Sequence, residues 1–350
     1  MDNIDNKAKG AESQPNRPKG NFVSRSNTSG TLIALLAILV LGFGLLTKNF
    51  FTFVNLKAIV SEIPIFAVVG VGMTFVILIA GLDLSVGSVL GFSVICGVLF
   101  SNLGLPAWVV VIASVIVGGV LGFINGLLIT KVGVNPVVTT LGMMAAARGA
   151  DSWLALGVPL LKVGRVYDEK LLGFGRQYIP AGAPILPITL IYIVVIYLVA
   201  AYVLKYTRFG RNVYAVGANP YAAKLAGIKV DRIKLLAYVI SGAMAGFGGM
   251  ILLAQLGLGR NDAGTGVELQ VITVCLLGGI SLAGGRGNLF GVLVAVLIIT
   301  VIENGMVQLQ SVYGISYFWD RVAKGVVLLA AILIDHYRQN VRQKAVRIRQ

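Results

Sequence analysis

The chain has 350 residues, of which 57% are hydrophobic and only 12% are charged, and its net charge is +15. Soluble domains carry about 25% charged residues and lack apolar runs of about twenty residues, so this composition excludes an ordinary soluble protein. The basic residues concentrate in the two ends and in one internal loop, which is typical of cytoplasmic segments in a membrane protein and requires no nucleic acid. We therefore expect an all-α polytopic membrane protein, because a β-barrel would show short alternating segments instead.

The first segment, residues 1–30, is polar and contains both charges, and its acidic residues argue against a cleaved signal peptide. We expect a disordered cytoplasmic N-terminal tail there. A transmembrane domain is expected over residues 31–337, followed by a basic cytoplasmic tail over residues 338–350.

Ten apolar segments follow one another through the transmembrane domain, and each is expected to cross the membrane as a helix. They are Thr31–Leu46, Ile63–Gly81, Leu84–Leu103, Pro106–Thr130, Pro136–Leu156, Ile185–Leu204, Leu235–Leu256, Glu268–Leu282, Asn288–Gln308 and Tyr317–Asp335. The fifth contains Arg148 and Asp151, and the eighth is short and flanked by glycines. Broken helices occur in membranes only where protein or an aqueous cavity surrounds them, so these two spans are expected inside the bundle.

Basic residues indicate the orientation of the spans. The loop of residues 205–234, between the sixth and seventh spans, carries seven Lys/Arg and one Asp. Lys131 follows the fourth span and Arg286 follows the eighth. Cytoplasmic loops carry an excess of Lys and Arg, so these segments and both termini are expected on the cytoplasmic side.

Glycines recur every fourth residue in three of the spans, and this spacing lets helix backbones approach closely. They are Gly118, Gly122 and Gly126, Gly87 and Gly91, and Gly242 and Gly246. We expect packing within the chain, with a dimer seam as the alternative.

Charged residues within or beside the spans have more than one interpretation. Asp83 and Ser85 either cap the helix that follows them or contact a passing solute. Arg148 and Asp151 are three residues apart and predict an ion pair on one helix face.

Further charges lie in the last two spans. Glu303 either lines a polar pathway or lies near the outer headgroups. Asp320, Arg321 and Lys324 begin the tenth span and are expected to anchor it at the interface or to contact an external partner.

Several catalytic motifs are absent from the sequence. It contains no GxxxxGK[ST] phosphate loop, no HExxH and no nucleophile elbow, and Cys96 and Cys275 belong to no CxxC pair. We therefore expect no enzymatic activity, metal or cofactor in this chain. A carrier with this sequence would take its energy from another subunit.

Four segments are distinctive: GLDLSVGS (81–88), NPVVTTLGMMAAARG (135–149), TRFGRNVYAVGANPYAAKLAGIKVDR (207–232) and LLGGISLAGGRGNLFGVLVAV (276–296). Together they resemble the permease subunits of bacterial ATP-binding-cassette (ABC) importers for simple sugars. The resemblance is to the ribose/xylose/galactoside branch, nearest to ribose permeases, and runs from about residue 31 to residue 337.

This resemblance implies a multi-pass protein of the bacterial cytoplasmic (inner) membrane that carries ribose or a similar monosaccharide by alternating access. Two permease chains, identical or paralogous, would form the pathway within the membrane lipid. An ATPase subunit that binds ATP and Mg would dock on each permease from the cytoplasm. A periplasmic or extracellular solute-binding protein would deliver the sugar.

The resemblance also implies a cytoplasmic coupling helix within GANPYAAKLAGI (217–228), between the sixth and seventh spans. Proline at position 220 suits a helix start and Gly227 suits a helix end, with a solvated loop as the alternative. The residues expected to serve ATPase coupling are Gly210, Arg211, Gly217, Ala218, Asn219, Ala222, Leu225, Gly227 and Ile228.

A neutral sugar requires hydrogen bonds and apolar walls rather than strong charge, which agrees with the scarcity of charged residues in the spans. The candidate pathway residues are polar residues within or beside the spans. They are Asp83, Ser85, Asn125, Asn135, Thr139, Gln270 and Asn304.

Two other classes of function remain open from the sequence. An ion-coupled secondary carrier for a small polar solute would use Asp83 and Glu303, and it predicts uptake by the lone chain under an ion gradient. A membrane-embedded enzyme acting on a lipid-linked substrate would need a reactive carboxylate or histidine pair at the interface, and the sequence shows no convincing one.

Overall fold

The computed structural model describes residues 28–157, 164–179, 186–316 and 318–347, and these ranges are almost entirely helical. The helices are α1 (Thr28–Leu46), α2 (Phe53–Leu78), α3 (Val86–Asn102), α4 (Ala107–Leu127), α5 (Pro136–Gly157), α6 (Glu169–Arg176), α7 (Thr189–Tyr206), α8 (Arg208–Ala218), α9 (Pro220–Leu225), α10 (Val230–Leu256), α11 (Val267–Leu277), α12 (Leu289–Tyr313) and α13 (Phe318–Arg347). A π-helical turn, η1 (Leu128–Val132), continues α4. The predicted all-α class is confirmed, whereas nearly all of the predicted N-terminal tail lies outside the described residues.

Each of the ten predicted spans coincides with a helix. Among the described residues, five helices are long and apolar enough to cross a membrane by length and composition, namely α2, α4 with η1, α7, α10 and α12. The apolar stretches of α1, α3 and α11 are shorter than these five helices. The count of ten spans therefore stays a prediction.

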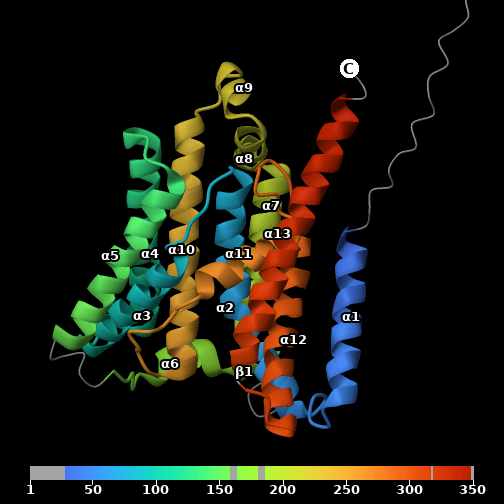
Figure 1. The fold of residues 1–350 in the computed structure, drawn as a ribbon. Coiled ribbons are helices and arrows are strands. Elements are labelled where there is room, and N and C mark those ends of the chain that lie inside the picture. The colour runs from blue at the N-terminus through green and yellow to red at the C-terminus, as the bar shows by residue number, and fades with distance from the viewer. Residues whose placement is uncertain (1–27, 158–163, 180–185, 317, 348–350) are drawn as a thin grey trace, which may run out of the picture.

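The segment between α5 and α7 contains structure that the sequence pattern does not reveal. The Asp168 carboxylate caps α6 by accepting a hydrogen bond from the amide of Lys170 at 2.8 Å. Two short strands, β1 (Tyr178–Ile179) and β2 (Leu186–Pro187), pair antiparallel beside it. This segment forms a small cover at one end of the bundle (Figure 1).

Helix α10 lies at the centre of the bundle and packs against α2, α3, α4 and α6. The predicted glycine spacing brings α10 close to α4. A Cβ atom on Gly118 would overlap the carbonyl of Gly242, and one on Gly122 would overlap the carbonyl of Tyr238. The glycines on α4 and α10 therefore pack within the chain, as the sequence predicts.

The two ends of the bundle differ in what they carry. Figure 1 places α9 and the C-terminal end of α13 at one end, toward which the beginning of α1 points, and α6 with β1 at the other. Helix α1 packs on α12, while α13 packs on α11 and α12. Helix α13 continues to Arg347, well into the segment expected to be a basic tail.

Two connections meet beneath α8: the turn segment, residues 79–85, and the glycine loop, residues 278–288. The sequences that contain these connections, LIAGLDLSVGSVLG and LLGGISLAGGRGNLFG, show a faint similarity. Both turn through a positive φ, at Ala80 (59°) and at Gly279 (88°). The amide of Gly285 donates to the carbonyl of Leu78, the last residue of α2, at 2.8 Å. A Cβ atom on Gly284 would meet the amide of Ala80 at 2.8 Å, so the two connections lie in one layer between α8 and the bundle.

Candidate functional site

The segment formed by α8 and α9, residues 208–225, is folded by local signals in its sequence. The Asn219 side-chain oxygen accepts a hydrogen bond from the amide of Ala222 at 3.0 Å, and Pro220 occupies the first turn of α9. Gly227 ends the helix with a φ of 80°, which a left-handed cap requires. A short helix is thus present within residues 217–228, and its coupling role stays a prediction.

Helix α8 rests closely on the layer beneath it. A Cβ atom on Gly217 would overlap the carbonyl of Leu78 and would also meet the amide of Gly285 at 2.5 Å. The hydroxyl of Tyr214 donates to the carbonyl of Gly287 at 3.0 Å. Only a residue without a side chain fits at position 217, where α8 lies directly against the end of α2 and the glycine loop.

The other predicted coupling residues lie along the same two helices. Gly210 packs against the backbone of Leu204 at the end of α7, and Arg211 donates to the carbonyl of Tyr206 at 3.2 Å. Ala218 meets Gly285, and the amide of Ile228 donates to Ala223 at 3.0 Å. Ala222 and Leu225 are exposed, with Leu225 74% exposed, and so α9 presents an apolar surface away from the bundle.

Asp83 is held by hydrogen bonds within the chain. It is 1% exposed, and its Oδ1 accepts from the amide of Ser85 at 3.0 Å and from the Ser85 hydroxyl at 2.6 Å. Its Oδ2 accepts from the hydroxyl of Ser241 on α10 at 2.8 Å. The Asn125 side chain on α4 donates to the Ser85 hydroxyl at 3.0 Å. These bonds join the turn segment to α4 and α10 and offset the cost of burying the carboxylate.

This arrangement refines the capping interpretation of Asp83 and Ser85. Ser85 occupies the N-cap position of α3, but its side chain makes no capping hydrogen bond to that helix and donates to Asp83 instead. The sequence does not reveal the contact of Ser241 with Asp83, because a serine in an apolar span gives no indication of its partner. A solute contact by Asp83, Ser85 or Asn125 stays a prediction.

The remaining predicted pathway residues lie in separate places. Asn135 immediately precedes α5, and its side-chain oxygen accepts from the amide of Val137 at 2.9 Å. The hydroxyl of Thr139 donates to the Asn135 carbonyl at 3.0 Å. Asn304 on α12 forms two hydrogen bonds, each 2.9 Å, with the side chain of Asn55 on α2. The spacing of residues in the sequence does not indicate that Asn55 and Asn304 would pair.

Gln270 belongs to a charge cluster formed by Glu62, Gln270, Glu303, Asp320 and Lys324. The Lys324 ammonium lies 2.6 Å from Glu303 and 2.8 Å from Asp320, and Gln270 also donates to Glu303. Glu62 on α2 interacts electrostatically with the same three charged residues. The structure therefore gives Lys324 and Asp320 specific partners within the chain, while their role as interface anchors stays a prediction.

Arg148 forms the expected pair with Asp151, at 3.5 Å, and donates to the carbonyl of Ala263 at 2.7 Å. It thus ties α5 to the loop before α11. On the same loop Arg260 donates twice to Asp262, which lowers the pKa of that exposed carboxyl. Both carboxylates expected for an ion-driven carrier, Asp83 and Glu303, likewise have partners within the chain.

Comparison with known proteins identifies the family. The chain belongs to the family described as branched-chain amino acid transport system / permease component, which matches residues 55–334. This match covers most of the chain, from α2 to α13.

Curated relatives carry narrower names. The chain is 36% identical over 310 residues to the ribose import permease protein RbsC of Escherichia coli (strain K12), covering 88% of this chain and 94% of that protein. It is 39% identical over 302 residues to RbsC of Bacillus subtilis (strain 168), covering 86% and 90%. The L-arabinose ABC transporter permease protein AraH of Azospirillum brasilense is 34% identical over 333 residues, covering 94% and 93%. The resemblance to sugar importer permeases that the sequence motifs indicate is confirmed.

Proposed function

We propose that this chain is the transmembrane permease subunit of an ABC importer that moves ribose or a similar monosaccharide across the bacterial inner membrane. The observation that carries the proposal is its similarity, over nearly its whole length, to permeases named for ribose and arabinose. Ten spans would put both termini in the cytoplasm. In agreement with this, the C-terminal end of α13 lies at the same end of the bundle as α9, and the beginning of α1 points toward that end (Figure 1).

The α8–α9 segment is the proposed point of ATPase coupling. The exposed apolar surface of Ala222 and Leu225 would dock on a separate subunit that binds ATP and Mg. Movement of this segment would shift Leu78, which Gly217 contacts, and with it the turn segment that follows Leu78 in the chain. Asp83 of the turn segment is hydrogen-bonded to Ser241 on α10. Binding of the nucleotide would then bias the bundle between outward-facing and inward-facing states.

The proposed pathway would hold the sugar through hydrogen bonds. A sugar offers hydroxyl groups, and the amide side chains of Asn125, Asn135, Gln270 and Asn304 can both donate and accept hydrogen bonds. A second permease chain, identical or paralogous, would complete the pathway. An external solute-binding protein would deliver the sugar at the end that carries α6 (Figure 1).

Reconstitution tests the proposal directly. Proteoliposomes with this chain, its matching ATPase subunit and a ribose-loaded binding protein are expected to hydrolyse ATP and accumulate ribose. The chain alone is expected to do neither. Ribose uptake by the lone chain under a proton or sodium gradient would contradict the proposal in favour of a secondary carrier.

A surface variant tests the coupling role. Replacing both Ala222→Asp and Leu225→Asp puts two charges on the exposed face of α9 without filling buried space. We expect ATPase docking and uptake to fall at least tenfold, because burying unpaired charge in an apolar interface costs several kcal/mol. Tyr167→Asp, which adds charge at an exposed position just before α6, is the control and should leave docking unchanged.

A further inference from the structure

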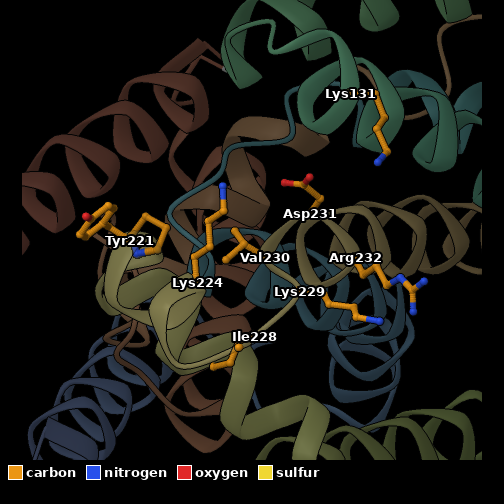
Figure 2. Close-up of a pocket in the computed structure, with 10 residues that line it drawn as sticks. Lys131, Tyr221, Lys224, Ile228, Lys229, Val230, Asp231 and Arg232 are labelled. Atoms are coloured by element: carbon orange, nitrogen blue, oxygen red, sulfur yellow. The ribbon is translucent and has the colours of Figure 1, made fainter.

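A basic pocket lies beside α9 at the end of α4 and the beginning of α10. Its volume is about 590 Å³, within the range of roughly 300–1,000 Å³ that ligand pockets occupy. Its lining residues are Lys131, Pro220, Tyr221, Lys224, Gly227, Ile228, Lys229, Val230, Asp231 and Arg232. Figure 2 shows Lys131 extending from η1 toward the first turn of α10, where Asp231 and Arg232 lie.

The charges of this pocket are not balanced within the chain. Four cations face one carboxylate, Asp231, which leaves a net charge of +3 at neutral pH. Among the residues that the structure describes, the ion pairs do not include any of these four cations. The pocket therefore offers more cationic donors than its single carboxylate can pair.

The position of the pocket along the helices agrees with that of a membrane surface. The helix of α4 with η1 ends at Val132 and α10 begins at Val230, so Lys131 and Arg232 lie at the ends of two helices that are long and apolar enough to cross a membrane. Ile228 and Val230 provide an apolar margin beside the cations. Lys and Arg at such positions extend toward headgroup phosphates.

We propose that this pocket binds the phosphate headgroup of an anionic phospholipid from the cytoplasmic leaflet. The assignment rests on the proposed function only in placing this end of the bundle in the cytoplasm. An acidic segment of the ATPase subunit is the competing occupant. A lipid is favoured because the cations come from helices at the membrane boundary, Lys131 included, as well as from α9.

The bound lipid would steady the coupling site. Lys224 lies on α9, Lys229 lies on the link to α10, and Lys131 lies on η1. One phosphate group contacted by all three would hold α9 in a fixed relation to α4 and α10. Anionic lipid is therefore expected to raise the stability of the purified chain.

Native mass spectrometry and thermal unfolding of the purified chain, without any ATPase, test the proposal. Phosphatidylglycerol is expected to remain bound and to raise Tm, whereas phosphatidylcholine is not. The double variant Lys131→Gln with Arg232→Gln should weaken phosphatidylglycerol binding about thirtyfold, because each cation that lies beside the bound phosphate contributes about a factor of five. Inorganic phosphate at the same concentration should not raise Tm, which separates a lipid from a free anion.

The control is Lys205→Gln with Arg208→Gln, which removes the same charge from the same end of the bundle outside this pocket. It should weaken binding less than about threefold. Equal loss in both double variants, or none in either, overturns the proposal. Loss of ATPase docking with phosphatidylglycerol retained in the pocket variant would assign the pocket to the ATPase instead. Because the lipid experiment uses the lone chain, its failure leaves the transport proposal standing.

Discussion

Single residues without side chains decide how α8 meets the bundle. Gly217 lies against two backbone groups, the carbonyl of Leu78 and the amide of Gly285, neither of which can rotate away as a side chain would. The resemblance places Gly217 among the expected coupling residues, but the sequence does not reveal what it packs against. Its importance becomes visible once the turn segment and the glycine loop lie beneath it, because those residues are distant in the chain.

Gly217→Ala is expected to displace α8 from its seat. Overfilling a packed contact costs about 1–3 kcal/mol, so Tm should fall and coupled uptake should fall with it. Gly142→Ala is the matched control, since a Cβ at position 142 meets nothing within 4 Å, and it should keep or slightly raise stability. An unchanged Tm and uptake in Gly217→Ala would show that α8 does not bear on this layer.

At the scale of elements, polar pairs hold the long helices together. Asn55 and Asn304 join α2 to α12, Arg148 joins α5 to the loop before α11, and Lys324 joins α13 to α12. The sequence predicts the helices themselves well, because apolar length is a local property. It predicts these partners poorly, because periodicity indicates a face and not the residue opposite it.

Lys324→Met is expected to destabilise the association of α13 with α12. It leaves the carboxylates of Glu303 and Asp320 close together and without their cation, a loss that costs about 3 kcal/mol in a largely buried pair. The double variant Lys324→Met with Glu303→Gln should cost less than the sum of the two single variants. Additive losses of stability would show that the two side chains do not interact.

At the scale of the whole molecule, both connections beneath α8 serve as one junction. The turn segment reaches α10 through Ser241 and Tyr238, whose hydroxyl donates to the Leu82 carbonyl at 3.4 Å. The glycine loop reaches α8 through Tyr214. Hydrogen bonds therefore connect α8, which precedes α9 in the chain, to the glycine loop, and connect the turn segment to α10 at the centre of the bundle.

Cysteine labelling tests the proposed orientation of this molecule. Leu225→Cys on α9 should react with a membrane-impermeant maleimide only in inverted vesicles, and Tyr313→Cys at the end of α12 only in right-side-out vesicles. Both sites are exposed, at 74% and 59%, while the native Cys96 and Cys275 are buried and should contribute little background. Labelling of Leu225→Cys from the exterior would overturn the coupling role of α9.

The sequence by itself determined the membrane class, the position of nearly every long helix and the short helix that begins at Asn219-Pro220. These follow from apolar length, capping residues and glycine, all of which act between near neighbours in the chain. Only the tertiary structure decided that Asp83 is bonded to Ser241, that Lys324 lies between Glu303 and Asp320, and that Lys131 shares a pocket with α9. A buried polar group must find a partner somewhere, and which partner it finds depends on how helices far apart in sequence pack together.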